Sequence, residues 1–234
     1  MATLPHISTP ALRIGEQDFV WGERTYVMGV VNATPDSFSG DGVLPTTGDV
    51  QQAVDQALRM EDEGADIIDV GGESTRPASI YPDAKPIEAE NEITRVVPVI
   101  EELIRCVGIP ISIDTRKAAV AAAAFVAGAS LVNDVSMLGD AEMPGMLANS
   151  GVPIIVSHIR QGGHDGNVVE NVLSDLHSSI EELARAGVER SNIIVDPGIG
   201  FAKSGAQSME MLRNIAALRA ELVLPVLIGT SRKS

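Results

Sequence analysis

Short aliphatic runs alternate along the chain with longer stretches in which apolar residues recur every three or four positions. The short runs have the length of strands, and the longer stretches have the periodicity of helices that bury one face. Two clear helical stripes run through residues 93–107 and 169–183. Seven strands are predicted, at residues 25–32, 66–71, 111–114, 131–135, 153–158, 193–197 and 225–231.

Alternating strands and helices predict an α/β fold with a parallel sheet and right-handed crossovers. Seven strands are compatible with a doubly wound sheet as well as with a barrel. A polar cluster follows one strand after another through the whole series, which favours a TIM-type (β/α)8 barrel, whose loops converge on one face. Residues 11–24 predict an N-terminal hairpin. Because no linker interrupts the pattern, residues 1–234 are expected to form a single domain.

Composition narrows the function classes. Hydrophobic residues make up 44% of the 234 residues and aromatic residues only 3%, so the core is aliphatic, as suits strands buried on both faces. The net charge of −15 argues against nucleic-acid and acidic-membrane partners. Cys106 is the only cysteine, which fits a reducing compartment. The sequence has neither a long apolar run nor a signal peptide, so a cytoplasmic protein without a membrane span is expected.

Chemistry in such a barrel is expected where the strands end. Polar or glycine-rich residues follow almost every predicted strand, beginning at Asn32, Gly71, Asp114, Asn133, His158, Asp196 and Ser231. Each has an ordinary structural interpretation. Asp114 could cap the next helix, Asn133 could bond to its own loop, and Asp196 could form a turn with the following proline and glycine. His158 could be a core or loop histidine as readily as a ligand.

Three of these side chains point to a ligand when they are taken together. Asp114, Asn133 and Asp196 each end an apolar strand, so a barrel would direct all three into one mouth. A buried carboxylate requires hydrogen-bond donors. The set therefore suggests a ligand rich in N–H groups, such as a guanine-like or pterin ring, with Lys233 toward its carbonyl side. Arg76, beside glycines, suits phosphate binding.

Six segments carry a resemblance to a known family. "VMGVVNATPDSFSGDG", "IIDVGGESTRP", "ISIDTRK", "LVNDV", "DPGIGFAK" and "GTSRKS" closely resemble, in this order, the signatures of the dihydropteroate synthase family. The resemblance implies a TIM-type barrel that joins p-aminobenzoate to 6-hydroxymethyl-7,8-dihydropterin pyrophosphate. The products would be 7,8-dihydropteroate, for folate synthesis, and pyrophosphate.

The resemblance also implies roles for individual residues. Asp114, Asn133, Asp196 and Lys233 would bind the pterin, and Asn32 would ligate Mg²⁺ held by the pyrophosphate. Phe201, Lys233 and Ser234 would shape the p-aminobenzoate site. The remaining members of the implied substrate-binding set are Thr75, Arg76, Pro77, Val135, Ile159 and Gly229. The implied catalytic residues, which would stabilise a pterin methylene cation and its leaving group, are Asp41, Arg76, Asp114 and Lys233.

The chain departs from the family pattern in four ways, one of which is that the family's Gly-Phe-Gly-Phe-Gly-Lys run here reads Gly198-Ile-Gly-Phe-Ala-Lys203. Asp41 is shifted by one residue within its loop, and Ile159 stands where a methionine is frequent. The family continues beyond Ser-Arg-Lys-Ser into a helix, an eighth strand and a final helix. A barrel truncated after its seventh strand, with little synthase activity, is therefore expected. The family suggests a homodimer, which such a truncation disfavours. Two alternatives remain: a pterin-binding methyltransferase domain and an inactive, incomplete barrel.

Overall fold

Six parallel strands form one sheet in the order of the sequence. The computed structural model describes residues 11–33, 47–73, 87–160, 162–164 and 166–230. The sheet strands are β3 (Met28–Asn32), β4 (Ile67–Gly71), β5 (Ile111–Asp114), β6 (Leu131–Asp134), β7 (Ile154–Ser157) and β8 (Ile193–Asp196). Each pairs in parallel with the next. Six of the seven predicted strands are thus confirmed, each within a few residues of its predicted limits.

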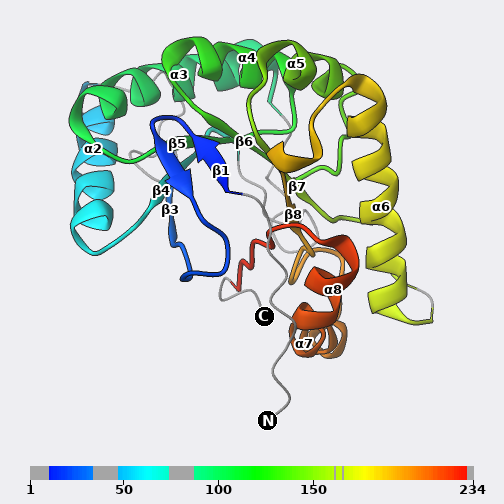
Figure 1. The fold of residues 1–234 in the computed structure, drawn as a ribbon. Helices are drawn as coiled ribbons and strands as arrows, with labels where there is room; N and C mark the ends of the chain where they lie inside the picture. The colour runs from blue at the N-terminus through cyan, green and yellow to red at the C-terminus, as the bar shows by residue number, and fades with distance from the viewer. Residues whose placement is uncertain (1–10, 34–46, 74–86, 161, 165, 231–234) are drawn as a thin grey trace.

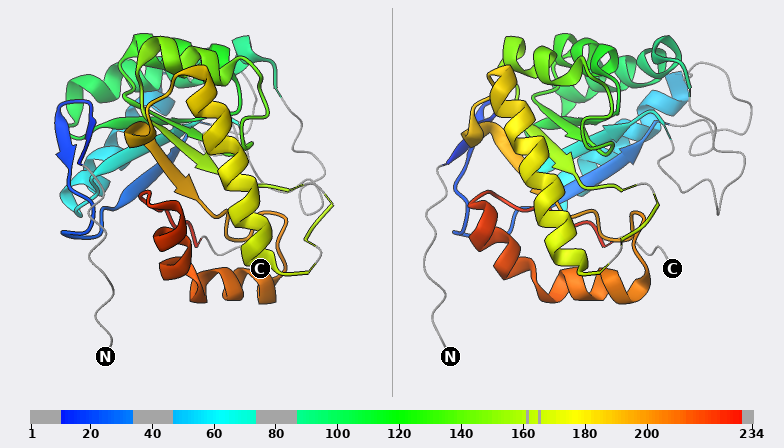
Figure 2. Two further views of the ribbon diagram at one scale, coloured as in Figure 1. Left: turned by 45° about the vertical axis from the view of Figure 1, so that its right-hand side comes forward. Right: turned by 90° about the vertical axis from the view of Figure 1, so that its right-hand side faces the viewer.

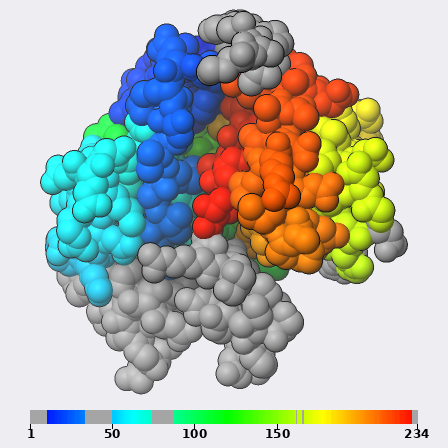
Figure 3. Space-filling model, turned by 90° about the horizontal axis from the view of Figure 1, so that it is seen from below, coloured from blue at the N-terminus to red at the C-terminus, as the bar shows by residue number. Residues whose placement is uncertain are grey.

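The seventh predicted strand, residues 225–231, forms only a short pairing in the described part. Leu227 donates its N–H to the Val195 carbonyl at 2.8 Å, and Val195 donates to Pro225 at 3.0 Å. These two bonds make an isolated parallel bridge between Val195 and Val226. Seen from below in Figure 3, the last described residues (red) lie between the N-terminal strands (blue) and the C-terminal helices (orange).

The helices lie in an arc outside the sheet (Figure 1). They are α2 (Thr47–Asp62), α3 (Ala89–Cys106), α4 (Ala118–Ala127), α5 (Met143–Ser150), α6 (Val168–Ala186), α7 (Gly205–Arg213) and α8 (Ile215–Leu222), with a 3-10 turn, η1 (Arg190–Asn192), before β8. Both helical stripes of the sequence are confirmed as α3 and α6. No helix in the described ranges is long and apolar enough to cross a membrane.

Strand side chains alternate between two separate apolar clusters. Outward-facing residues such as Ile68, Ile113 and Val156 pack with the buried faces of the helices in the main core. Their neighbours in sequence face the inside of the curved sheet, because successive side chains of a strand point to opposite faces. Near the beginning of the strands the inside is apolar, with Ile67, Leu131, Ile155 and Ile194.

The predicted hairpin covers this apolar end. It consists of β1 (Leu12–Ile14) and β2 (Gln17–Phe19), which pair antiparallel. Leu12, Ile14 and Phe19 are almost fully buried, in the same cluster as the inward isoleucines and leucine at the strand beginnings. In the right-hand view of Figure 2 the strands run away from the hairpin. One end of the sheet interior is therefore closed by apolar side chains, and chemistry is left to the opposite end.

Candidate active site at the carboxyl ends of the strands

A polar layer lies directly above the apolar layer inside the sheet. Two residues beyond each inward apolar side chain of β4, β6, β7 and β8 the sequence places a polar one, and a step of two residues keeps a side chain on the same face. The four are Asp69, Asn133, Ser157 and Asp196, all buried. Ser112 and Asp114 occupy the inward positions of β5. Strand alternation thus collects the polar groups at one mouth.

Asp69 and Asn133 form the centre of this layer. Asn133 donates from Nδ2 to Asp69 Oδ2 at 2.9 Å, although the residues lie on β6 and β4, with β5 between them. Three acceptor oxygens here are buried and have no hydrogen-bond partner among the described residues: Asp69 Oδ1, Asp114 Oδ1 and Asn133 Oδ1. Buried acceptors are costly unless a donor meets them. The mouth is therefore suited to a ligand that presents several N–H groups.

Burial, and for Asp114 also the crowding of carboxyls, raises the pKa of the acidic side chains at this mouth. Burial raises the pKa of Asp69, with the neighbouring Ser112 hydroxyl and the hydrogen bond from Asn133 acting in the opposite direction. Burial also raises the pKa of Asp114 well above its ordinary value, and the neighbouring Asp69, Glu92 and Asp134 add to the increase. A cationic or donor-rich ligand would relieve this repulsion.

Gly71 lies beside two side-chain oxygens at the mouth. A Cβ built on Gly71 would lie 3.6 Å from Asp114 Oδ2 and 3.9 Å from Asn32 Oδ1. The Asn32 side chain is exposed, at the end of β3. Amide and carboxylate oxygens suit Mg²⁺, which is commonly held by few protein ligands together with substrate phosphates. Within the described residues, no cluster of three or more His, Cys, Asp or Glu side chains is arranged to hold a metal.

Asp196 is held at the end of β8 by its own turn and by β7. Its Oδ1 accepts from the Gly198 N–H at 2.7 Å, and its Oδ2 accepts from Ser157 Oγ at 3.2 Å. The predicted turn of Asp196 with the following proline and glycine is thus present, and it engages one of the two carboxylate oxygens, Oδ1. Gly198 has a φ of +66°, and a Cβ there would lie 1.9 Å from the His158 carbonyl oxygen. Only glycine fits this approach.

His158 is a fully buried histidine in a chain of charged groups. Its Nε2 lies 2.9 Å from Asp175 Oδ2, and its Nδ1 lies 2.9 Å from Lys203 Nζ. Arg160 binds Asp175 through two bonds, of 2.9 and 2.8 Å. Burial and the charge of Lys203 lower the pKa of His158 to about 4. His164 is half-buried and stacks on His158 with ring centroids 5.3 Å apart.

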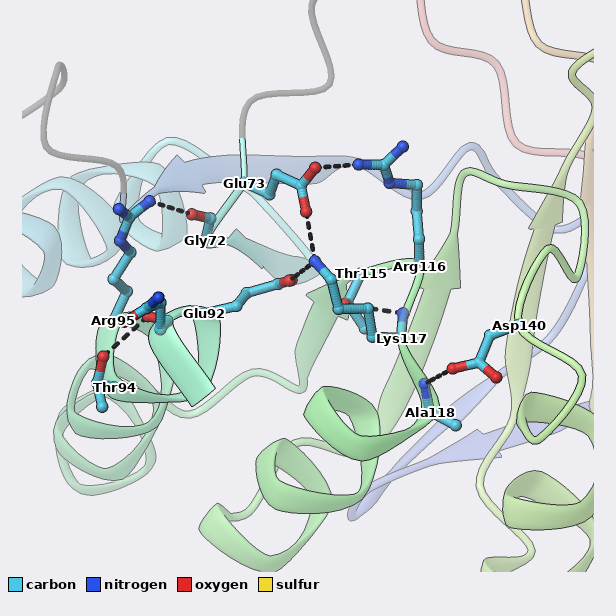
Figure 4. A network of polar contacts seen from close by, with 11 residues as sticks. Gly72, Glu73, Glu92, Thr94, Arg95, Thr115, Arg116, Lys117, Ala118 and Asp140 are labelled. Carbon is cyan, nitrogen blue, oxygen red and sulfur yellow. Dashed lines mark hydrogen bonds and ion pairs between the residues drawn. The ribbon is translucent and has the colours of Figure 1, made fainter. Parts of the chain in front are cut away.

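A second charged network lies beside the end of β4 (Figure 4). Glu73 forms ion pairs with Arg116 and Lys117, and Lys117 also binds Glu92 at 2.5 Å. Glu92 is completely buried, so Lys117 compensates a charge that water does not reach. The network connects the segment after β4, the loop after β5 and helix α3. It fixes Glu73, two residues beyond the end of β4.

The structure brings together four of the predicted site residues. Asn32, Asp114, Asn133 and Asp196 all lie at the mouth. Asp114 does not cap α4, because the Ala118 N–H donates to Asp140 instead, and Asn133 bonds to Asp69 rather than to its own loop. Half-buried residues after the strands include Val135, Ile159 and Phe201, while Gly229 is exposed. The other predicted residues lie outside the described ranges: Asp41, Thr75, Arg76, Pro77, Lys233 and Ser234.

Several polar residues of this region are absent from the set that the sequence suggested. Asp69 lies inside an aliphatic strand run, where only its two-residue spacing from Ile67 and Gly71 marks it as inward-facing. Asp175 looks like one of many acids on an amphipathic helix. Nothing local in the sequence pairs Glu73 with Lys117 or Lys203 with His158. These contacts arise because strands that are distant in sequence end side by side.

The comparison with protein families covers the whole sheet. A family model described as "Pterin binding enzyme" matches residues 28–234. A dihydropteroate synthase of Clostridium beijerinckii is 45% identical over 224 residues, which is 95% of this chain and 80% of that relative.

Solved structures give the same result. A Xanthomonas albilineans dihydropteroate synthase with 4-aminobenzoic acid superimposes with a TM-score of 0.87 at 39% identity, covering 97% of this chain and 80% of the other. The enzyme of the same organism in complex with 7,8-dihydropteroate gives a TM-score of 0.83 at 38% identity, covering 96% and 79%. The predicted TIM-barrel fold is confirmed at this level of similarity.

Proposed function

Since the chain belongs to the dihydropteroate synthase family of pterin-binding enzymes, we propose that its polar mouth binds a dihydropterin pyrophosphate and p-aminobenzoate and joins them. The family's enzymes are transferases of folate biosynthesis. The observation that carries the proposal is the set of three buried, unpaired acceptors contributed by Asp69, Asp114 and Asn133.

The pterin ring matches these acceptors. Its amino group and ring N–H groups are donors, and acceptors held by the sheet would pair with them without reorganisation. Asp196, held by Gly198 and Ser157, adds a further carboxylate at the same mouth. Lys233 is proposed to meet the ring carbonyl, as the family resemblance implies. Nearby carboxylates also favour positive charge on the bound ring.

The pyrophosphate end is assigned to the side of Asn32. Its exposed oxygen and that of Asp114 both face the space over Gly71, which supports a Mg²⁺ site shared with the substrate. The ion, when bound, would neutralise charge on the departing pyrophosphate. Thr75, Arg76 and Asp41 are proposed partners of the same region on the family resemblance.

The reaction exchanges one bond for another at the pterin methylene. The C–O bond to pyrophosphate breaks, and the leaving group takes the electron pair. The arylamine nitrogen of p-aminobenzoate then forms a C–N bond to the methylene and loses a proton. The chain's own contribution is to hold the ring, stabilise its positive charge through Asp114 and Asp196, and position the arylamine near Phe201. Pro77, Val135, Ile159, Gly229 and Ser234 are proposed to complete the substrate contacts.

A product assay tests the proposal. Turnover of both substrates by the purified protein, even at a low rate, should yield dihydropteroate and pyrophosphate in equal amounts, and omission of Mg²⁺ should suppress both. Asp196→Ala should weaken pterin binding by about 2–5 kcal/mol, because it removes a hydrogen-bonded buried charge. Asp18→Ala, on the hairpin at the other end of the sheet, is the matched control. Wild-type pterin affinity in Asp196→Ala would overturn the assignment. Methyl transfer to a corrinoid in place of pyrophosphate release would indicate the alternative function.

Two coarser expectations accompany the function. We propose a cytoplasmic enzyme, supported by the exposed free thiol of Cys106, and a homodimer, supported by the family resemblance alone. Light scattering of the purified protein would measure the oligomeric state.

A further inference from the structure

The amine of Lys203 is surrounded by three acceptors from two neighbouring loops. It lies 3.0 Å from the Gly198 carbonyl oxygen, 3.3 Å from the Phe201 carbonyl oxygen and 2.9 Å from His158 Nδ1. An ammonium group has three N–H donors. The three donors of the ammonium group therefore match the three acceptors. Through them the Lys203 side chain joins both ends of the Gly198–Phe201 turn to His158, the residue that follows β7.

The His158 ring presents a lone pair to Lys203 because of its other neighbour. Two hydrogen bonds from Arg160 and one from His158 outweigh burial and keep the pKa of Asp175 below its ordinary value, so this carboxylate is an acceptor. The Nε2 atom of His158, 2.9 Å from Asp175, must then carry the proton. The neutral ring has only one N–H, which leaves Nδ1 to accept from Lys203.

The turn that Lys203 binds also determines where two proposed substrate contacts lie. The Gly198 N–H orients the Asp196 carboxylate at 2.7 Å, and the Phe201 N–H closes the turn on the Gly198 carbonyl at 3.1 Å. The close approach of Gly198 to the His158 backbone leaves the turn no freedom toward β7. Any movement of the turn would therefore displace Asp196 and Phe201 together.

We propose that Lys203 is a positioning residue of the active site: its ammonium group holds the Gly198–Phe201 turn against His158 and so fixes Asp196 and Phe201 for the two substrates. This inference rests on the proposed function. Lys203 forms its hydrogen bonds with Gly198, Phe201 and His158 and none with Asp69, Asn133 or Asp114, so it acts on the site through the turn and through its charge attraction to Asp196.

The role requires the charged form of the lysine. A neutral amine keeps two N–H groups for three acceptors, and His158 can supply a proton to the third bond only by losing its bond to Asp175. Burial lowers the pKa of Lys203 to about 8, while Asp196 and Asp175 act in the opposite direction. The other titratable groups that face this cluster are His158 and His164, and Arg160 adds a fixed charge. Substrate affinity is thus expected to fall as the pH rises through about 8.

Steady-state kinetics of Lys203→Met and Lys203→Arg between pH 6.5 and 9.5 test this role. In the Met variant the KM for p-aminobenzoate should rise at least about 10-fold at pH 7, the loss expected for one charge-assisted bond. Its alkaline rise in KM should also disappear. In the Arg variant, whose guanidinium stays charged, that rise should move beyond the measured range. Arg213→Met, an exposed position at the end of α7, removes the same charge and should behave like wild type.

Either of two kinetic results would overturn the proposal: a wild-type KM with an unchanged alkaline rise in Lys203→Met, or an unchanged alkaline rise in Lys203→Arg. The second applies even if the Met variant fails to fold. Hydrogen exchange separates this test from the proposed function, because it needs no substrate. The Phe201 amide should lose protection in Lys203→Met, and in wild type above pH 8, beyond the intrinsic increase with pH. Unchanged protection would refute the role of Lys203 in holding the Gly198–Phe201 turn. Absence of dihydropteroate from the wild-type reaction would refute the proposed function and leave that role untouched.

Discussion

Asn133 donates its amide N–H to Asp69 across the interior of the sheet, at 2.9 Å, and this bond decides which end of the amide meets a ligand. With Nδ2 engaged by the carboxylate, Oδ1 is left as a buried acceptor. Without Asp69 the amide could turn over and present donors to a ring that also presents donors. Asp69 thus determines that Asn133, a predicted pterin-binding residue, offers the ligand an acceptor rather than a donor.

Asp69→Ala is therefore expected to weaken pterin binding by about 1–3 kcal/mol, because one buried bond is lost and the amide is no longer oriented. Calorimetry with a pterin ligand at pH 7 measures the change. Asp134→Asn is the matched control. Its carboxyl is buried on the adjacent strand position, but it accepts from Ser136 and Leu138 in its own loop. The control should alter stability and leave affinity intact, and equal affinity losses in both variants would contradict the argument.

Two adjacent glycines should separate ligand binding from stability. A methyl on Gly71 would have only ordinary contacts, at 3.6 Å from Asp114 and 3.9 Å from Asn32, so Gly71→Ala should fold normally. The methyl would occupy the space between two proposed ligands and should weaken binding of pterin pyrophosphate with Mg²⁺. A methyl on Gly72 would lie 2.6 Å from Val96 and 3.0 Å from Glu92. Gly72→Ala should therefore cost roughly 1–3 kcal/mol of stability through overpacking.

Urea unfolding and substrate titration of both variants provide the test. The expected pattern is crossed, with loss of affinity in the first variant and loss of stability in the second. If Gly71→Ala bound substrate like wild type, the space over Gly71 would not be part of the site.

Most of the fold can be predicted from the sequence because each parallel strand is an isolated aliphatic run. Buried strands need apolar residues on both faces, so β4 to β8 stand out in the sequence, and their predicted ends agree with the structure within a residue or two. Residues 225–231 show the limit of this signal. They are as aliphatic as the other strands, yet only the pair of bonds around Val195 connects them to the described sheet. Pairing depends on neighbours, which composition does not encode.

The sequence reveals the site residues only where a polar residue ends a strand. Asp114, Asn133 and Asp196 have that position, whereas Asp69 lies two residues before the end of β4 and is flanked in sequence by isoleucine and valine. Its role follows only from two facts together: its side chain faces inward, and β6, two strands away in the sheet, brings Asn133 to it. The lysines illustrate the opposite case. Lys117 and Lys203 look like solvated loop cations, and their importance comes from Glu92 and His158, which helix and strand packing bury beside them.

The charged network around Glu73 and Glu92 predicts unequal losses of stability when its two cations, Lys117 and Arg116, are replaced. Lys117→Met should cost about 3–5 kcal/mol of stability, because Glu92 is completely buried and would lose its ion-pair partner. Arg116→Met should cost about 1 kcal/mol or less, since Arg116 is 41% exposed and Glu73 would keep its bond to Lys117.

Urea unfolding at pH 7 compares the two variants directly. Both remove one positive charge, from consecutive residues, so net charge does not explain a difference between them. Similar losses in the two proteins would show that burial of Glu92 does not determine the energetics of the network.

Burial of neutral His158 should make stability depend on pH. The pKa of His158 is about 4 in the folded chain, against about 6.5 in the unfolded chain. Between these values the unfolded state binds the proton and the folded state does not, so acidification favours unfolding. The stabilising contribution is complete above pH 6.5 and is lost progressively as the pH falls toward 4. From pH 7 to 5 the loss should be about 2 kcal/mol for this single group.

The raised pKa values of Asp69, Asp114 and Asp134 act with the opposite sign, because these carboxyls take up protons in the folded state first. A comparison with a variant that lacks the imidazole removes this background, which is common to both proteins. His158→Gln retains an amide N–H for Asp175 and cannot titrate. Urea unfolding at pH 7 and pH 5 should therefore show a drop in the free energy of unfolding that is about 2 kcal/mol larger for wild type than for the variant. An equal drop in both proteins would mean that His158 accepts its proton inside the fold as easily as in the unfolded chain, and the neutral ring between Asp175 and Lys203 would then be the wrong assignment.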